Sequence, residues 1–348
     1  MAQKLYEESN IQAIANAIRS KNGLTTTYKT SEMAAAITAI EGGGSTPPPV
    51  EDGKTRIYVH LEDGRKSPML GICPNGTVTV DWGDGTEPNI LTGASLTMVK
   101  WTPTHNYAAA GDYVISLTVD GSAGLYSIDG TNEYSCLLRY KVGSDSRNYV
   151  YQNAISKVEI GNGITRLNDY AFKNCSGLKS VTIPNTLSDI PLGCFSYCYS
   201  LSYVSLPNSI TSISTEAFRE CYALSSVSLP NGITSISNSM FRGGYSLQTI
   251  EIPDTVTSID DYAFHYCRCL SNIIIPHGVT SIGAHAFDSC YGMKYYDFTA
   301  LTAIPKLGAT NVFNGMSSDC EIRVPAALAY NWKTATNWAK YSSYIVGV

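Results

Sequence analysis

The chain has 348 residues, of which 44% are hydrophobic and 15% are charged, so its composition predicts a folded protein rather than a disordered one. The 24 basic and 29 acidic residues give a net charge of −5, which argues against a duplex nucleic-acid partner. No segment approaches the roughly 18 consecutive apolar residues of a membrane helix, so no membrane insertion is expected. Tyrosine is in excess, with 24 Tyr against 8 Phe, which favours a binding face.

The first forty residues are expected to form a helical hairpin. Apolar residues recur at helical spacing at Ile11, Ile14 and Ile18, and again at Met33 and Ile37. A hairpin of this size cannot bury its apolar stripes alone, so residues 1–41 are expected to dock onto a partner or to oligomerise. The Gly- and Pro-rich segment 42–53 is then a linker.

Residues 54–125 have the alternating pattern of short strands and predict a small β-sandwich. Asp84 directly precedes Gly85, and Asp81 and Asp84 lack the further oxygen ligands of a calcium loop, so a turn is expected there. This stretch resembles the PKD domain, an immunoglobulin-like sandwich that serves as a spacer or binding module. The matching segments are Val80-Asp81-Trp82-Gly83-Asp84-Gly85-Thr86, Thr104-His105-Asn106-Tyr107 and Gly111-Asp112-Tyr113-Val114.

After a connector at 126–154, residues 155–324 repeat with a period of 23. Columns of Cys, Leu, Pro and Ile keep the same period as Phe172, Phe195, Phe218, Phe241, Phe264 and Phe287. The unit closely resembles the BspA-like class of leucine-rich repeat. One short strand per repeat is expected, for example at Val181 and Ile183, with successive strands stacked in parallel about 4.8 Å apart.

The period slips after Phe287, because Phe313 follows 26 residues later. Residues 325–348 are expected to cap the stack, with Trp332, Trp338 and Tyr341 over the last rung. The predicted fold class is therefore mainly β with a small α part: an N-terminal helical hairpin, an immunoglobulin-like (PKD-like) sandwich, and a C-terminal leucine-rich-repeat solenoid.

The cysteine column suggests a disulfide or metal site, but its geometry is wrong for either. Side chains in stacked rungs lie parallel and about 4.8 Å apart, whereas a disulfide needs converging Cβ atoms about 3.5–4.5 Å apart and zinc needs four converging ligands. No cofactor or metal is expected. Buried, reduced thiols are predicted at Cys175, Cys198, Cys221, Cys267 and Cys290.

No nucleophile elbow, zinc-protease motif or phosphate-binding loop occurs, so the chain is not expected to be an enzyme. His105 belongs to the PKD-like motif and is expected to be structural. His265, His277 and His285 fall at three different phases of the repeat. They are expected to face solvent, with a metal trio as the alternative.

A tyrosine column directly follows the cysteine column. Tyr and Arg dominate binding hot spots, so this column is the predicted ligand-binding site. The alternative is that the rings only pack over the edge of the repeats. Tyr197, Tyr203, Tyr262, Tyr266, Tyr295 and Tyr296 are expected to enlarge the set. The predicted ligand-binding residues are Tyr199, Tyr222, Tyr245, Arg268 and Tyr291.

Residues 10–40 resemble a short module of bacteriophage tail proteins, and Met1–Glu8 carries no signal peptide. The first hypothesis is therefore a virion protein, made in the host cytoplasm, of a tail fibre or baseplate. It would bind a host cell-surface glycan or protein through its repeats. Residues 1–41 would join other virion proteins or copies of the chain. The alternative is a BspA-like adhesin at the bacterial cell surface. A glycan-active enzyme comes third.

Overall fold

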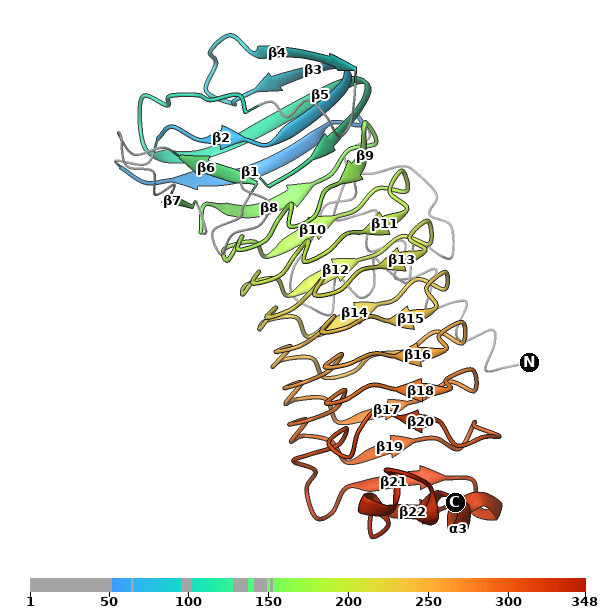
Figure 1. Cartoon of the computed structure of the whole chain (residues 1–348). Helices are drawn as coiled ribbons and strands as arrows, with labels where there is room; N and C mark the ends of the chain where they lie inside the picture. Colours follow the sequence, from blue (N-terminus) through green and yellow to red (C-terminus); the bar gives the residue numbers. More distant parts are fainter. Residues whose placement is uncertain (1–51, 64–65, 95–101, 128–136, 141–148, 151–152) are drawn as a thin grey trace, which may run out of the picture. The chain divides into compact units, whose positions relative to one another are not determined.

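The computed structural model describes residues 52–63, 66–94, 102–127, 137–140, 149–150 and 153–348 (Figure 1). The chain divides into the units Met1–Val50 and Glu51–Val348, and all of these residues belong to the second. The expected helical module at 1–41 and nearly all of the linker lie outside them. None of the helices within these ranges has the length and apolarity needed to cross a membrane.

The first described strands form an antiparallel sheet in the order β1-β5-β3-β4. Alternation along β1 buries Ile57, Val59 and Leu61. A second, small sheet has the order β2-β6-β7. These strands do not by themselves establish an immunoglobulin-like topology, so the PKD-like assignment stays a prediction. The bounds are β1 Thr55–Leu61, β2 Met69–Leu70, β3 Ile72–Asp81, β4 Asn89–Ala94, β5 Gly111–Leu125, β6 Leu138–Tyr140 and β7 Tyr149–Val150.

The predicted turn after β3 is confirmed. Gly83 and Gly85 adopt φ of 80° and 82°, the left-handed region in which glycine carries no steric penalty. Trp82 stacks on His105 with ring centroids 5.2 Å apart. Nε2 of His105 lies 2.7 Å from Oδ2 of Asp84. The motif residues are therefore brought together to fix the turn.

The rest of the described chain is a solenoid, as the 23-residue period predicted. Most turns carry two short strands rather than the one expected, because the Ile column is also extended and pairs in register, with Ile190 opposite Ile213. One line of strands is β8 Ile155–Glu159, β10 Ser180–Thr182, β12 Tyr203–Ser205, β14 Ser226–Ser228, β17 Asn272–Ile274, β19 Tyr295–Asp297, β21 Glu321–Val324 and β22 Ile345–Gly347. The other is β9 Ile164–Leu167, β11 Asp189–Ile190, β13 Ser212–Ile213, β15 Ser235–Ile236, β16 Ser258–Ile259, β18 Ser281–Ile282 and β20 Lys306–Leu307.

The phenylalanine column forms a continuous stack through the core of the solenoid. From Phe172 to Phe313, neighbouring ring centroids are 5.2 to 5.8 Å apart. Phe313 stays in the stack despite its longer spacing, because two of the three additional residues lie between β19 and β20 and the third lies between β20 and Phe313. The slip in sequence period therefore leaves the core unbroken.

The corner around each phenylalanine adds a further line of backbone hydrogen bonds between rungs. Glu216 and Glu220 flank Phe218, and both have a left-handed backbone, with φ of 59° and 58°. All three backbone N–H groups donate to carbonyls of the next rung, which offsets the strain of the left-handed residues. This corner holds the side chains of successive rungs in parallel rows.

Both ends of the solenoid are covered. At the first rung, β8 pairs antiparallel with β1, so the solenoid sheet continues into the preceding sheet (Figure 1). At the other end, Trp332 packs on Phe298, while Trp338 and Tyr341 pack on Phe313. The C-terminal helical elements are η1 Ala326–Leu328, α3 Ala329–Thr334 and η2 Ala339–Tyr341.

Candidate functional site

The predicted tyrosine column forms one continuous stack. The ring centroids of Tyr199 and Tyr222 are 4.7 Å apart, as are those of Tyr222 and Tyr245, with interplanar angles of 21° and 8°. The guanidinium carbon of Arg268 lies 4.8 Å from the Tyr245 centroid and 5.8 Å from that of Tyr291. These five residues are called the Tyr/Arg ladder below.

The ladder follows from the repeat itself. Each member comes directly after a residue of the buried column that includes Cys198 and Cys221, so its side chain leaves the corner in the same direction in every rung. Tyr199 is 41% exposed and Tyr291 is 54% exposed, Arg268 is also exposed, and the inner rings are half-buried. Because the faces of the inner rings are covered by their neighbours, their exposed parts are edges. The ladder therefore meets solvent through ring edges and one cation.

Two tyrosines of the ladder, Tyr199 and Tyr222, are held in their neutral form. Burial raises the pKa of Tyr222, and a hydrogen bond to Glu220 raises it further. Burial also raises the pKa of Tyr199, with Glu220 adding to the effect. Arg268 is the charged member of the ladder. Its guanidinium makes no ion pair or hydrogen bond with any residue in the described ranges.

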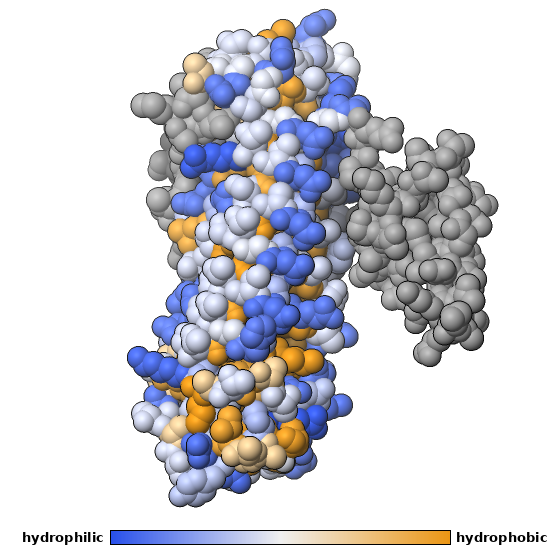
Figure 2. Space-filling view, turned by 90° about the vertical axis from the view of Figure 1, so that its right-hand side faces the viewer, coloured by the Kyte–Doolittle hydropathy of each residue, from blue (hydrophilic) through white to orange (hydrophobic). Residues whose placement is uncertain are grey.

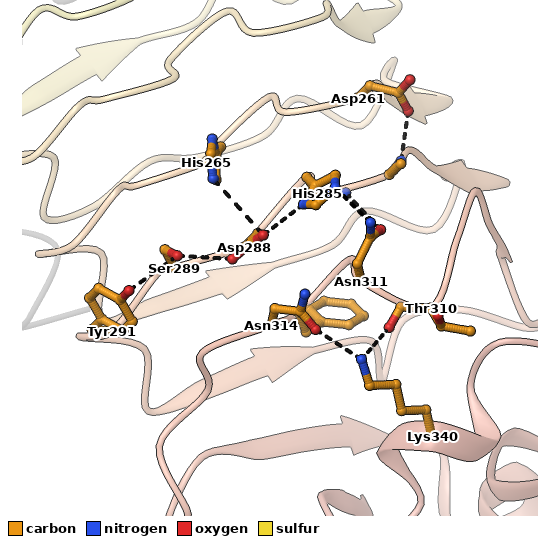
Figure 3. A network of polar contacts seen from close by, with 12 residues as sticks. Asp261, His265, His285, Asp288, Ser289, Tyr291, Thr310, Asn311, Asn314 and Lys340 are labelled. Atoms are coloured by element: carbon orange, nitrogen blue, oxygen red, sulfur yellow. Dashed lines mark hydrogen bonds and ion pairs between the residues drawn. The ribbon is translucent and has the colours of Figure 1, made fainter.

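At Tyr291 the ladder joins a polar network (Figure 3). The Tyr291 hydroxyl donates to Oγ of Ser289 at 3.2 Å, and Ser289 donates to Oδ1 of Asp288 at 2.9 Å. Oδ2 of Asp288 lies 2.6 Å from Nδ1 of His285 and 4.0 Å from Nε2 of His265. Ser289 thus donates to a carboxylate rather than to a histidine, which is not the arrangement of an activated nucleophile.

The histidines depart from expectation. His265 is only 8% exposed, because it lies between Tyr262 and Tyr266, so its predicted solvent-facing position is wrong. Burial lowers the pKa of His265 to about 4. His285 is half-buried against Asp288, whereas His277 is exposed. Among the residues that the structure describes, no three His, Cys, Asp or Glu side chains are grouped so as to hold a metal ion.

The cysteine column is buried, as predicted. The thiols of Cys198, Cys221, Cys267 and Cys290 each donate to the carbonyl of the phenylalanine one rung earlier, at 3.1 to 3.3 Å. Burial raises the pKa of the Cys221, Cys267 and Cys290 thiols. Their role is therefore to pack and to bond adjacent rungs.

The other predicted tyrosines do not all join the ladder. Tyr296 is fully buried, so its assignment to the surface set is wrong. Tyr203 and Tyr295 lie on β12 and β19. Arg323 lies over Tyr295, with its guanidinium carbon 3.9 Å from the ring centroid, but it is also paired with Glu321 at 2.8 Å.

A shallow groove follows the second line of strands. It comprises two hollows of about 290 and 450 Å³ that share Asp260 in their walls. The first is otherwise lined mainly by Ser and Thr, and the second also has Asp261 and Lys306 in its wall. Its first hollow lies where β13 and β15 are not paired. No member of the Tyr/Arg ladder lines it. Figure 2 shows one side of the solenoid, where hydrophilic residues dominate and hydrophobic ones gather near the lower, C-terminal end.

The sequence profile of the BspA type leucine rich repeat region matches residues 145–268 and 234–335. Together the two matches run from 145 to 335, more than half of the 348 residues. The chain belongs to the BspA-type leucine-rich repeat family. This membership agrees with the 23-residue period and with the stacked rungs of the solenoid.

Several solved structures are similar to this BspA-type chain. A leucine-rich repeat protein of T. pallidum is 24% identical over 48% of this chain and 78% of that one, with a TM-score of 0.44. A leucine rich cell surface protein from Faecalibacterium prausnitzii A2-165 is 27% identical over 54% of this chain and 53% of that one, with a TM-score of 0.35. The chain therefore spans about half the length of the latter. No curated protein matches the chain.

Proposed function

We propose that this BspA-type protein is a bacterial surface adhesin that binds a ligand on another cell through its Tyr/Arg ladder. The observation that carries the proposal is the ladder itself: four tyrosines and one arginine from successive rungs in a single stack. Rigid aromatic side chains lose little entropy on binding, and phenols and a guanidinium supply directional polar contacts.

The family assignment supports the surface location, since the BspA-like class is one of bacterial surface antigens. A solenoid whose two ends are covered by its own chain leaves its long sides for binding. The half-buried inner rings also stabilise the edge of the repeats, because each stacked aromatic pair contributes about 0.5–1.5 kcal/mol. A substitution that tests binding separately from packing must therefore keep the rings stacked.

The test measures attachment of the fluorescently labelled full chain to a panel of cells. The double variant Tyr222→Phe/Tyr245→Phe keeps the rings and removes the hydroxyls. We expect it to bind at least tenfold more weakly and to stay folded, with only a small fall in melting temperature from the lost Tyr222–Glu220 hydrogen bond. The control, Tyr203→Phe/Tyr295→Phe, removes two hydroxyls from β12 and β19 and should bind normally. Equal binding by both double variants would contradict the proposal.

A second candidate is a phage virion protein that uses the same ladder against its host. One observation favours it: the resemblance of residues 10–40 to a module of bacteriophage tail proteins. In that role residues 1–41 would attach the chain to other virion proteins. Antibodies against the chain decide between the two candidates. They would label purified virions if the chain is a virion protein, and the bacterial cell envelope if it is a surface adhesin.

A further inference from the structure

We propose that the Tyr/Arg ladder binds a carboxylated glycan and that Arg268 holds its carboxylate. The proposal rests on the proposed function, because it assigns a ligand class to the same ladder.

Arg268 is positioned by aromatic rings on several sides. Its guanidinium carbon lies 4.8 Å from the centroid of Tyr245, 5.4 Å from that of Tyr266 and 5.8 Å from that of Tyr291. The rings restrict the side chain while it stays exposed to solvent. A guanidinium presents a planar fork of N–H donors that matches the two oxygens of a carboxylate. The ladder therefore offers a preformed anion contact at one defined rung.

The acidic side chains around the ladder are already engaged. Glu216 and Glu220 lie 2.6 and 3.9 Å from the Arg219 guanidinium, and Asp288 pairs with His285. Arg323, which also lies on a tyrosine, has Glu321 as its partner. Arg268 pairs with none of the carboxylates in the described part of the chain, although the net charge is −5. An acid supplied by a ligand would complete its hydrogen bonding.

The rest of the ladder favours a polyhydroxylated ligand over an acidic peptide. Peptides bind by adding a strand to a sheet edge, by placing side chains in apolar or aromatic-lined grooves, or, when acidic, by contacting a cluster of arginines. The ladder offers a single arginine, phenol groups and ring edges, and the two hollows of the groove lie along the second line of strands. Small residues border the ladder at Ser200, Ala223 and Ser246, which leaves a long ligand room to follow it.

Binding of the full chain is measured against immobilised polygalacturonate, hyaluronan and polysialic acid. Each polysaccharide is paired with its own methyl ester, which neutralises the carboxylates and keeps the sugar. Dextran sulfate and poly-glutamate complete the panel. We expect at least one carboxylated polysaccharide to bind at least tenfold more tightly than its ester, dextran sulfate or poly-glutamate.

Arg268→Gln should weaken that binding at least tenfold, and Arg268→Lys should weaken it less, because the charge remains without the fork. Arg323→Gln is the matched control, since Arg323 also lies on a tyrosine but has its own acid, and it should bind normally. Melting temperatures should be unchanged in all three variants.

Three results would overturn the proposal: no carboxylated polysaccharide binds, the esters bind as well, or Arg268→Gln binds normally. Binding of dextran sulfate or poly-glutamate as tight as that of the best polysaccharide would overturn the assignment to a glycan carboxylate. If Tyr222→Phe/Tyr245→Phe loses cell binding while Arg268→Gln does not, the proposed function stands and this inference fails. If neither variant loses cell binding, the proposed function fails as well.

Discussion

The guanidinium carbon of Arg268 lies 4.8 Å from the ring centroid of Tyr245, nearly the 4.7 Å that separates the rings of Tyr245 and Tyr222. Arg268 therefore takes the place of a tyrosine ring and continues the stack. The rung accepts either a ring or a planar cation.

The first prediction follows from this equivalence. Arg268→Tyr should extend the tyrosine stack with little change in the free energy of unfolding, within about 0.5 kcal/mol, as is usual for surface substitutions. It should also remove the salt dependence of cell attachment, since the one ladder cation is lost. Attachment measured from 50 to 300 mM NaCl, against wild type and Arg323→Gln, checks this. A salt dependence that persists in Arg268→Tyr would mean that the electrostatic attraction to the cell comes from charges outside the Tyr/Arg ladder.

A second prediction concerns the phenylalanine stack. Phe241 is 1% exposed and stacks on Phe218 and Phe264. Phe241→Ala should lower the free energy of unfolding by about 3–5 kcal/mol, the cost of a large cavity in a packed core. Denaturant unfolding measures it, with Tyr330→Ala as the control, because Tyr330 is 77% exposed. A loss below about 1 kcal/mol would mean that the rungs do not depend on the stack.

The thiols give a third prediction. Cys269 is exposed, whereas its neighbour Cys267 is fully buried and its pKa is raised by that burial. Native alkylation with iodoacetamide should therefore label Cys269 and leave Cys198, Cys221 and Cys267 unmodified and unbridged. Peptide mass spectrometry before and after unfolding identifies which cysteines are alkylated and which are bridged. Labelling of Cys267 at the rate of Cys269, or a disulfide within the column, would contradict the buried ladder of thiols.

The fourth prediction is a pH dependence of stability. Burial lowers the pKa of His265 to about 4, while Asp288 opposes that shift and Arg242 and His285 add to it. The folded state then binds fewer protons than the unfolded state, whose histidine has a pKa near 6.5. The stabilisation is complete above about pH 6.5 and falls as the pH drops toward 4. Between pH 7 and pH 5 the loss from this group should be on the order of 2 kcal/mol.

Denaturant unfolding of His265→Gln at both pH values is the control for that prediction, because glutamine does not titrate. The variant should lose less stability than wild type between pH 7 and pH 5. An equal loss in both proteins would assign the acid sensitivity to other groups.

The solenoid could be predicted from the sequence because the 23-residue period is kept at the positions whose side chains pack in the core. The same core space must be filled in every rung by the phenylalanines from Phe172 to Phe287 and by the Ile column. The repeat is therefore visible in this one sequence. The second line of strands was not predicted, since two-residue strands such as Ser212–Ile213 carry no alternation to read. Pairing of β8 with β1 was missed because it joins Val158 to Ile57, far apart in the sequence.

The ladder was predicted in part for the same reason. A 23-residue spacing places Tyr199, Tyr222 and Tyr245 in one row, but spacing does not reveal that the rings stack or that Arg268 fits among them. His265 shows the limit of this reasoning, because its burial depends on contacts with Tyr262 and Tyr266, which lie beside it in the same turn of the solenoid. Such local cages leave no periodic signal.

The most direct test of the central claim, that the Tyr/Arg ladder is the binding surface, is quantitative attachment of the full chain to cells by Tyr222→Phe/Tyr245→Phe. The rings and their stacking remain, so the protein should stay folded and lose only the Tyr222–Glu220 hydrogen bond from its own structure. Two hydrogen bonds to the ligand, of about 1 kcal/mol each, are lost. The account predicts attachment at least tenfold weaker than wild type, by a protein that stays folded with only a small fall in melting temperature. Attachment equal to that of wild type would contradict it.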